Sequence, residues 1–187
     1  TVLFLTFLST FSIGQQIEML PLPPQQASFC FSTRGFHFTS PLDMKIISLR
    51  VPTTISTGPQ SIAVVSFNNN QAPPAFPGNT SNYTELFYVS NDPSMTEIPV
   101  DIDLVAGQVY GVYGSRNGCN SYGTIGPWMT QVFGEDVTMS RSGMQTNIAN
   151  NFPFPIWSEV NFRIGRIEVT CQLGGGGGGA LCEPNDC

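Results

Sequence analysis

The chain has 187 residues, of which only 11% are charged, and its 7 Lys and Arg against 13 Asp and Glu give a formal net charge of −6. Binding a phosphate backbone requires clustered Lys and Arg, whereas Arg141, Arg163 and Arg166 are scattered in this sequence, so nucleic acid is excluded as the expected partner. The length suits one domain with terminal extensions. Because Gly and Pro interrupt every window with a helical period, an all-β fold is expected.

Residues 1–13, TVLFLTFLSTFSI, form the most apolar run of the chain. In an extended strand, one face would carry Leu3, Leu5, Phe7, Phe11 and Ile13. Burying five such side chains would contribute roughly 8–15 kcal/mol, which predicts a surface that covers them. We therefore expect residues 1–14 to be a retained strand that completes the sheet of a neighbouring subunit. The alternative is a secretory signal sequence, because the run is too short to span a membrane as a helix.

Residues 15–27 are expected to be a linker, because Pro21, Pro23 and Pro24 favour an extended, stiff connection. Such a spacer suits a strand that projects to another subunit, and it suits a mature N-terminus equally well. The folded domain is expected over residues 28–172. The remaining residues, 173–187, form a tail that contains six consecutive glycines.

Alternating apolar and polar residues, separated by turn signals, predict a series of short strands. They are expected at residues 29–31, 36–38, 44–52, 61–67, 83–90, 98–104, 109–113, 128–133, 137–141 and 157–171. Residues 61–67 are apolar on both faces, so this strand should be central. In residues 44–52 we expect Ile47, Leu49 and Val51 to point inward, and His37 should face solvent between Phe36 and Phe38.

Four connections complete the predicted arrangement. Around Arg34 and Gly35 we expect a turn between the first two strands, and at Ala106 and Gly107 a turn that joins two adjacent strands of one antiparallel sheet. Residues 68–81 and 115–126 are expected to be loops. In residues 157–171 the apolar positions change parity near Gly165, which predicts a β-bulge there.

This pattern predicts an all-β chain that folds as a single antiparallel β-sandwich of the jelly-roll type. The order FHFTSPLDMKIISLRVP, SIAVVSF and DIDLVAGQVYGVYG resembles β-sandwich modules of secreted bacterial surface proteins. Those modules pair a Phe-rich opening strand with a late L-x-A-G-x-x-Y hairpin, here Leu104, Ala106, Gly107 and Tyr110. The resemblance covers residues 36–171 and implies a fold and an extracellular location. The N-terminal strand resembles the donor strand of pilus subunits.

The five cysteines are expected to form disulfides in an oxidising compartment, since no CxxC occurs and His37 has no cysteine near it in sequence. The first and last strands of a sandwich are often neighbours, so Cys30 is expected to pair with Cys171. Cys182 and Cys187 are candidates for a small loop in the tail, which leaves Cys119 as the odd thiol. No metal or other cofactor is expected.

Candidate binding and modification residues are few. Asn79 and Asn82 each begin an N-x-[ST] sequon and are candidates for glycosylation. Asp101 and Asp103 share one strand face, which is typical of a solvated face; with Asp43 they offer an alternative calcium site.

Five aromatic residues are candidates for a sugar-stacking surface, although ordinary packing is the expected role of Tyr110, Tyr113, Tyr122, Trp128 and Trp157. No catalytic motif surrounds any serine or cysteine, so the chain is not expected to be an enzyme.

The function expected from these features is that of a structural subunit of an extracellular, pilus-like filament at the cell surface. It would polymerise by inserting residues 1–14 into the sandwich of a second copy, and its partners would be itself and covalent glycans, with no membrane span. The alternative is a secreted glycan-binding or adhesive module in which residues 1–14 are a signal peptide. Trp128 and Trp157 would then be the residues whose mutation abolishes sugar binding.

Overall fold

The structure is a computed structural model that describes residues 15–150 and 152–174. The described chain contains one short 3-10 turn, η1 (Asn68–Asn70), and no α-helix, which confirms the prediction that the chain is all-β. Accordingly, no helix among the described residues is long and apolar enough to cross a membrane. The strands are β1 (Ile17–Met19), β2 (Ala27–Cys30), β3 (Thr33–Thr39), β4 (Met44–Arg50), β5 (Gln60–Phe67), β6 (Tyr83–Asp92), β7 (Ile98–Leu104), β8 (Val109–Arg116), β9 (Cys119–Ile125), β10 (Trp128–Val132), β11 (Glu135–Met144), β12 (Trp157–Ser158), β13 (Arg163–Gly165) and β14 (Glu168–Leu173).

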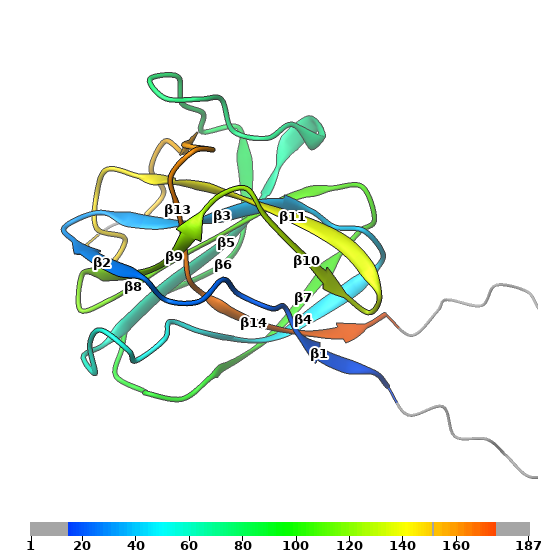
Figure 1. The fold of residues 1–187 in the computed structure, drawn as a ribbon, viewed down its shortest axis with the longest axis horizontal. Helices are drawn as coiled ribbons and strands as arrows, with labels where there is room; N and C mark the ends of the chain where they lie inside the picture. The colour runs from blue at the N-terminus through cyan, green and yellow to red at the C-terminus, as the bar shows by residue number, and fades with distance from the viewer. Residues whose placement is uncertain (1–14, 151, 175–187) are drawn as a thin grey trace, which may run out of the picture.

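The strands form a small sheet and a large sheet (Figure 1). The small sheet has four strands in the order β1-β14-β4-β7. The large sheet has ten, of which six follow the order β10-β11-β3-β8-β5-β6; β12 joins it through β11, and β2 and β13 join it through β9, which pairs with β8. The paired strands run antiparallel throughout, so the predicted antiparallel arrangement is confirmed.

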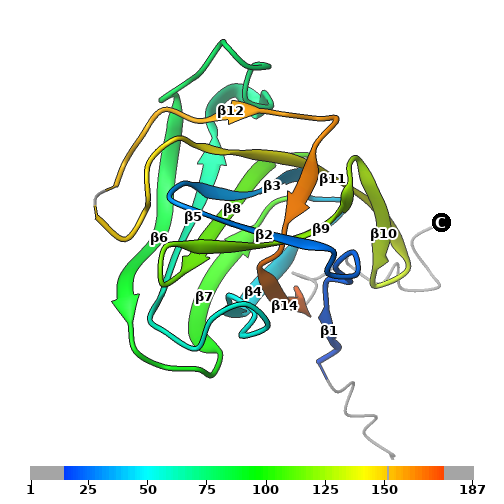
Figure 2. The same cartoon turned by 60° about the vertical axis from the view of Figure 1, so that its left-hand side comes forward.

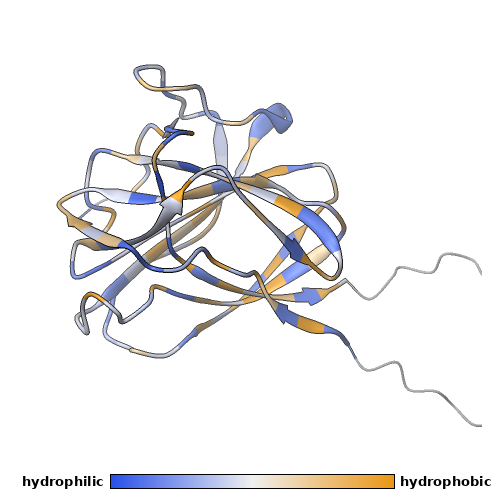
Figure 3. Cartoon of the chain, in the orientation of Figure 1, coloured by the Kyte–Doolittle hydropathy of each residue, from blue (hydrophilic) through white to orange (hydrophobic). Residues whose placement is uncertain are grey.

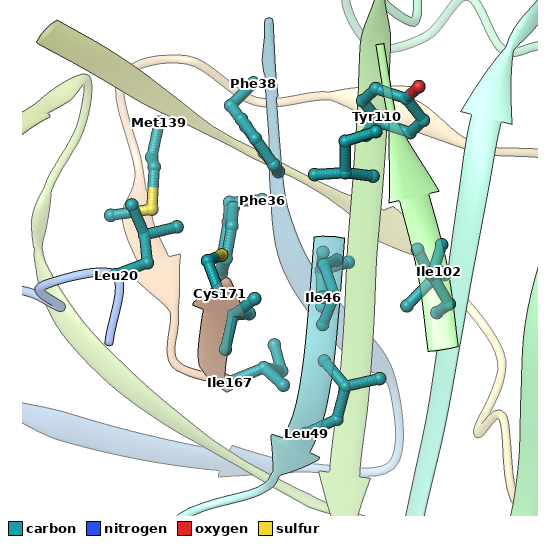
Figure 4. Packing of buried hydrophobic residues seen from close by; sticks show 14 of the residues in the cluster. Leu20, Phe36, Phe38, Ile46, Leu49, Ile102, Tyr110, Met139, Ile167 and Cys171 are labelled. Carbon is teal, nitrogen blue, oxygen red and sulfur yellow. The ribbon is translucent and has the colours of Figure 1, made fainter. Parts of the chain in front are cut away.

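The main hydrophobic core draws side chains from both sheets. Hydrophobic and hydrophilic residues alternate along many of the strands (Figure 3), as expected where one face of a strand is buried. The large sheet contributes Phe36, Phe38, Ile62, Val64, Tyr110, Val112, Val132, Val137, Met139 and Ile164, and the small sheet Met44, Ile46, Leu49, Ile102, Leu104, Val169 and Cys171. Figure 4 shows Cys171 beside Phe36, and Leu20 beside Met139. Burying each large side chain contributes about 1.5–3 kcal/mol, so this cluster is the main stabilising feature of the fold.

A second hydrophobic cluster includes further residues of the large sheet. It joins Ala63, Val65, Phe67, Val109, Tyr113 and Met144 to Ile148, Phe152 and Ile156 of the segment that follows β11. Along β5, residues of the two clusters alternate, so this strand is buried on both faces. It pairs with β6 and β8, and the prediction that residues 61–67 form a central strand is therefore confirmed.

The hairpin predicted at residues 98–113 is wrong in its pairing, although both of its strands exist. β7 pairs with β4 in the small sheet, whereas β8 pairs with β3 and β5 in the large sheet. The connection turns at Gly107, whose φ is 78°, and Gly107 N and Gln108 O bond to the backbone of Ser40. An alternating pattern indicates which face of a strand is buried, and it does not identify the partner strand.

The beginning of the domain also differs from the prediction. The turn lies at Phe31, whose φ is 75°, and not at Arg34 and Gly35; β2 pairs with β9 instead of β3. Residues 115–126 are not a loop, because β8 and β9 are joined by a tight turn at Asn117 and Gly118, both of which have positive φ. An Asn-Gly pair is a strong hairpin signal, and it was present in the sequence.

The last predicted strand, residues 157–171, is divided into β12, β13 and β14. β13 belongs to the large sheet and β14 to the small one, so the chain crosses between the sheets at Arg166 and Ile167. The change of parity near Gly165 therefore reflects this crossing between the sheets and not only a β-bulge. The pairing of β13 with β9 is also irregular, between Arg163 and Gly165. In β4 a similar irregularity, between Ile46 and Ser48, buries Ile46 fully and leaves the predicted Ile47 half-buried.

His37 is buried instead of solvent-facing, with 8% of its surface exposed. Its strand, β3, is flanked on both edges by β8 and β11, and β13 packs against it as well. Burial lowers the pKa of His37 to about 4.

Candidate functional site

The predicted polymerisation residues, Leu3, Leu5, Phe7, Phe11 and Ile13, lie outside the described residues, as do Cys182 and Cys187. The structure therefore shows the surfaces next to these segments. Two features of the described chain are candidates for function: the region where residues 15–26 join the small sheet, and a cavity that gathers three arginines.

Residues 15–26, expected to be a projecting linker, are packed on the domain. Leu20 is fully buried in the main core. The Nε1 group of Trp128 donates to the carbonyl of Pro21 at 3.1 Å, and Nε of Arg166 donates to the carbonyl of Pro23 at 3.0 Å. The prolines keep the backbone extended, and an extended backbone leaves its carbonyl groups available to these donors.

β1 is an edge strand of the small sheet, and its side chains leave a partly apolar surface. Ile17 is 58% exposed and Met19 is 45% exposed. The pairing with β14 continues to Gln16, whose carbonyl accepts from the backbone N–H of Leu173 at 2.9 Å. Both ends of the described chain therefore lie side by side at one end of the small sheet, as Figure 1 shows. An exposed edge strand with apolar side chains is a ready site for pairing with another chain.

The disulfide prediction is corrected by the structure. Cys30 pairs with Cys119, which lies directly opposite it across β2 and β9, and not with Cys171. Cys171 is a buried free thiol on β14, and burial, with a smaller contribution from Glu18, raises its pKa to about 12. β2 and β14 belong to different sheets, so the first-and-last-strand argument paired the wrong residues.

The two glycosylation candidates, Asn79 and Asn82, are both exposed. They lie in the long connection between β5 and β6 and line a hollow of about 270 Å³. The side-chain oxygen of Asn82 accepts from Nδ2 of Asn68 at 2.8 Å.

Asp101 and Asp103 face a lysine of the neighbouring strand. Lys45 Nζ donates to Asp101 Oδ1, and Asp103 Oδ1 lies 3.3 Å from the same atom. These hydrogen bonds, Asp101 first, raise the pKa of Lys45. Asp43 instead accepts from the backbone N–H of Ala106 at 2.8 Å, and no cluster of three or more metal-ligating side chains occurs among the described residues.

The five aromatic residues considered as a sugar-stacking surface pack inside the domain or against it. Tyr110, Tyr113, Tyr122 and Trp157 are buried, each with 8% or less of its surface exposed, and Trp128 is half-buried. They therefore offer no common exposed face to a sugar.

A cavity of about 520 Å³ lies between β2, β9, β11 and β13. Figure 2 shows β2 alongside β9, and β9 pairs with β13 as well. The cavity is lined by Phe29, Ser32, Arg34, Tyr122, Ile125, Arg141, Gln145, Asn161, Phe162 and Arg163. This cluster was not predicted from the sequence, because its three arginines come from β3, β11 and β13, which lie far apart in the chain.

Two of these arginines are held by one carboxylate. Glu159 Oε2 accepts from Nε of Arg34 at 2.9 Å and from Nε of Arg141 at 2.7 Å. Burial by itself would raise the pKa of Glu159, but the charges and hydrogen bonds of Arg34 and Arg141 together lower it below its usual range. The carboxylate is therefore ionised at neutral pH and fixes both guanidinium groups.

Arg141 is also fixed by aromatic rings. Its guanidinium carbon lies 5.0 Å from the ring centre of Tyr122 and 5.4 Å from that of Phe162. Arg34 lies over Trp157 in the same way, at 5.4 Å. Such cation–π contacts hold the charge in place without neutralising it.

Comparison with known proteins does not place the chain in a family. No protein-family model matches the chain, and the search of curated proteins found no match.

Proposed function

We propose that this chain is a structural subunit of an extracellular filament, in which residues 1–14 of one copy pair with the sheet of the next copy. The observation that carries the proposal is the position of β1. The most apolar run of the sequence leads directly into an exposed edge strand whose Ile17 and Met19 are themselves apolar. Both features favour contact with another chain over contact with water.

The fold proposed for this subunit is a jelly-roll sandwich. Its support is the main core, to which the two sheets contribute opposing side chains, and the crossing of the chain between sheets after β7 and after β13. Because the core is filled by the domain's own side chains, an open edge is the acceptor that we propose. Within the described residues, β6, β7 and β10 stand at the ends of the strand orders. A contact from residues 1–14 of one copy to such an edge of the next is head-to-tail, so the assembly would extend as a fibre.

Two chemical features support the proposed extracellular location of the protein. The Cys30–Cys119 disulfide is of a kind that persists in oxidising compartments, and Asn79 and Asn82 are exposed enough to carry glycans.

Negative-stain electron microscopy of the purified protein, with and without residues 1–14, tests the proposal. We expect fibres from the full chain and dispersed particles from the truncated one, with circular dichroism showing that both remain folded. Fibres from the folded truncation, or dispersed particles from both samples, would contradict it. Mass spectrometry of the secreted protein is the second measurement, because a mature N-terminus at Gln15 supports the alternative in which residues 1–14 are a signal peptide.

A further inference from the structure

We propose that the cavity lined by Arg34, Arg141 and Arg163 is a binding site for a saccharide that carries a carboxylate, of the hexuronic acid class. The inference rests on the cavity alone and stands whether or not the chain forms filaments. At about 520 Å³ the cavity falls within the range of small-molecule sites.

The first step of the argument is charge. The chain contains 7 Lys and Arg in total and is acidic overall, yet three of its arginines line this one cavity. Glu159 is the carboxylate that pairs with Arg34 and Arg141, so the site keeps an excess of positive charge. An acidic protein that gathers its few cations in one hollow offers a local site for an anion.

The second step is the hydrogen-bonding capacity that remains. Within the described residues, the hydrogen bonds of Arg34, Arg141 and Arg163 use Nε and Nη1, and their Nη2 groups take no part in them. The hydrogen bonds through Nε and Nη1 fix the planes of the guanidinium groups. The Nη2 groups are therefore held in defined positions as donors for a ligand. A carboxylate matches such donors better than other acids, because its two oxygens pair with a planar fork.

The third step is a buried hydroxyl. Ser32 lines the cavity, is 2% exposed, and its Oγ has no hydrogen-bond partner among the described residues. A buried polar atom without a partner is unfavourable unless a ligand or water satisfies it. Asn161 and Gln145 add exposed amides to the same lining. These groups fit the hydroxyl groups of a sugar, which both donate and accept.

The fourth step is the apolar rim. Phe29 is 57% exposed, Phe162 is 57% exposed and Ile125 is 61% exposed, and all three line the cavity. Exposed aromatic and aliphatic side chains beside polar groups suit the apolar C–H faces of a sugar ring. A bare inorganic anion would leave this rim unused, so the combination favours a carboxylated sugar.

Isothermal titration calorimetry on the full chain tests the inference, with trigalacturonic acid as the probe. Its fully methyl-esterified form is the matched neutral ligand, because it retains the rings and loses the charge. We expect the ester to bind about tenfold more weakly than the acid, as loss of a charge-assisted hydrogen bond predicts. Inorganic sulfate should compete poorly. Equal affinity for acid and ester, or sulfate that competes as well as the acid, would overturn the assignment.

Variants locate the site. Arg163→Gln should weaken binding of trigalacturonic acid about tenfold, and Phe162→Ala should weaken it too. Arg50→Gln is the matched control, because Arg50 pairs with Glu168 on the small sheet and lies outside the cavity. We expect Arg50→Gln to bind as the parent chain does. If Arg163→Gln and Arg50→Gln bind equally well, the cavity is not the site.

Discussion

Buried charged and titratable residues set several properties of this domain at the scale of single residues. Arg116 is completely buried, and its guanidinium donates to the carbonyls of Val51, Gly58 and Ser94 and to the side chain of Gln60. Burial lowers its pKa, but these acceptors satisfy its donors. Arg116 thereby ties the β4–β5 connection, the β6–β7 connection and the start of β5 to the end of β8.

His37 gives the domain a pH-dependent stability. Burial lowers its pKa from 6.5 to about 4, and its Nδ1 has no hydrogen-bond partner among the described residues. Between these two pH values the unfolded chain binds a proton that the folded chain does not, so stability falls as the pH falls. We expect the free energy of unfolding to drop by about 3 kcal/mol from this residue between pH 7 and pH 4. Urea denaturation at several pH values measures it.

His37→Asn is the control for this prediction, because asparagine does not titrate. The variant should lose most of the pH dependence between pH 6.5 and pH 4.5, because the proton that distinguishes the unfolded from the folded parent chain is then absent. An equal decline in the parent chain and the variant would assign the effect to other groups.

At the scale of elements, β13 crosses β3 with very close backbone contact. A Cβ atom on Gly165 would lie 2.7 Å from the backbone N of Gly35 and 2.8 Å from the backbone carbon of Arg34. The absence of a Cβ atom at Gly165 therefore permits the crossing, and residues of both strands, Arg163 on β13 and Arg34 on β3, line the same cavity. The cavity depends on this contact as much as on its own side chains.

Gly165→Ala should consequently destabilise the domain by about 1–3 kcal/mol, which is the usual range for overpacking a buried site. Thermal or urea unfolding measures the change. Glu85→Ala, on the exposed part of β6, is the control and should leave stability nearly unchanged. A Gly165→Ala variant as stable as this control would show that the two strands can separate without cost.

At the scale of the whole molecule, residues 15–26 belong to the folded domain. They supply β1, the fully buried Leu20, and the carbonyls that accept from Trp128 and Arg166. They connect the small sheet to β10 and to the crossing between β13 and β14, so the domain begins earlier than the sequence pattern predicts.

Removal of residues 1–26 should therefore destabilise the domain, whereas removal of residues 1–14 should leave its folded core intact. The loss of Leu20 alone predicts about 2–5 kcal/mol, since a cavity remains where it was buried. Urea unfolding of the two truncations compares them directly. If both unfold at the same urea concentration, residues 15–26 contribute nothing to the core.

The local pattern of the sequence was sufficient for much of the fold. Alternation and turn residues indicated the all-β class and the positions of most strands, because side-chain burial in a strand has a fixed period of two. The central place of β5 followed from its apolar residues on both faces, and the change of parity near Gly165 marked a real crossing point. Each of these properties depends on neighbours within one strand.

Strand pairing and the grouping of distant side chains were decided by the tertiary structure alone. Cys30 pairs with Cys119, β7 and β8 belong to different sheets, and His37 is buried. Each of these features depends on which strand, distant in sequence, pairs with the strand that carries the residue. The arginine cavity arose in the same way, from β3, β11 and β13. The sequence by itself determined which face of most strands avoids water. The three-dimensional packing determined which strands pair and which side chains meet, because strand pairing depends on the burial of the whole core.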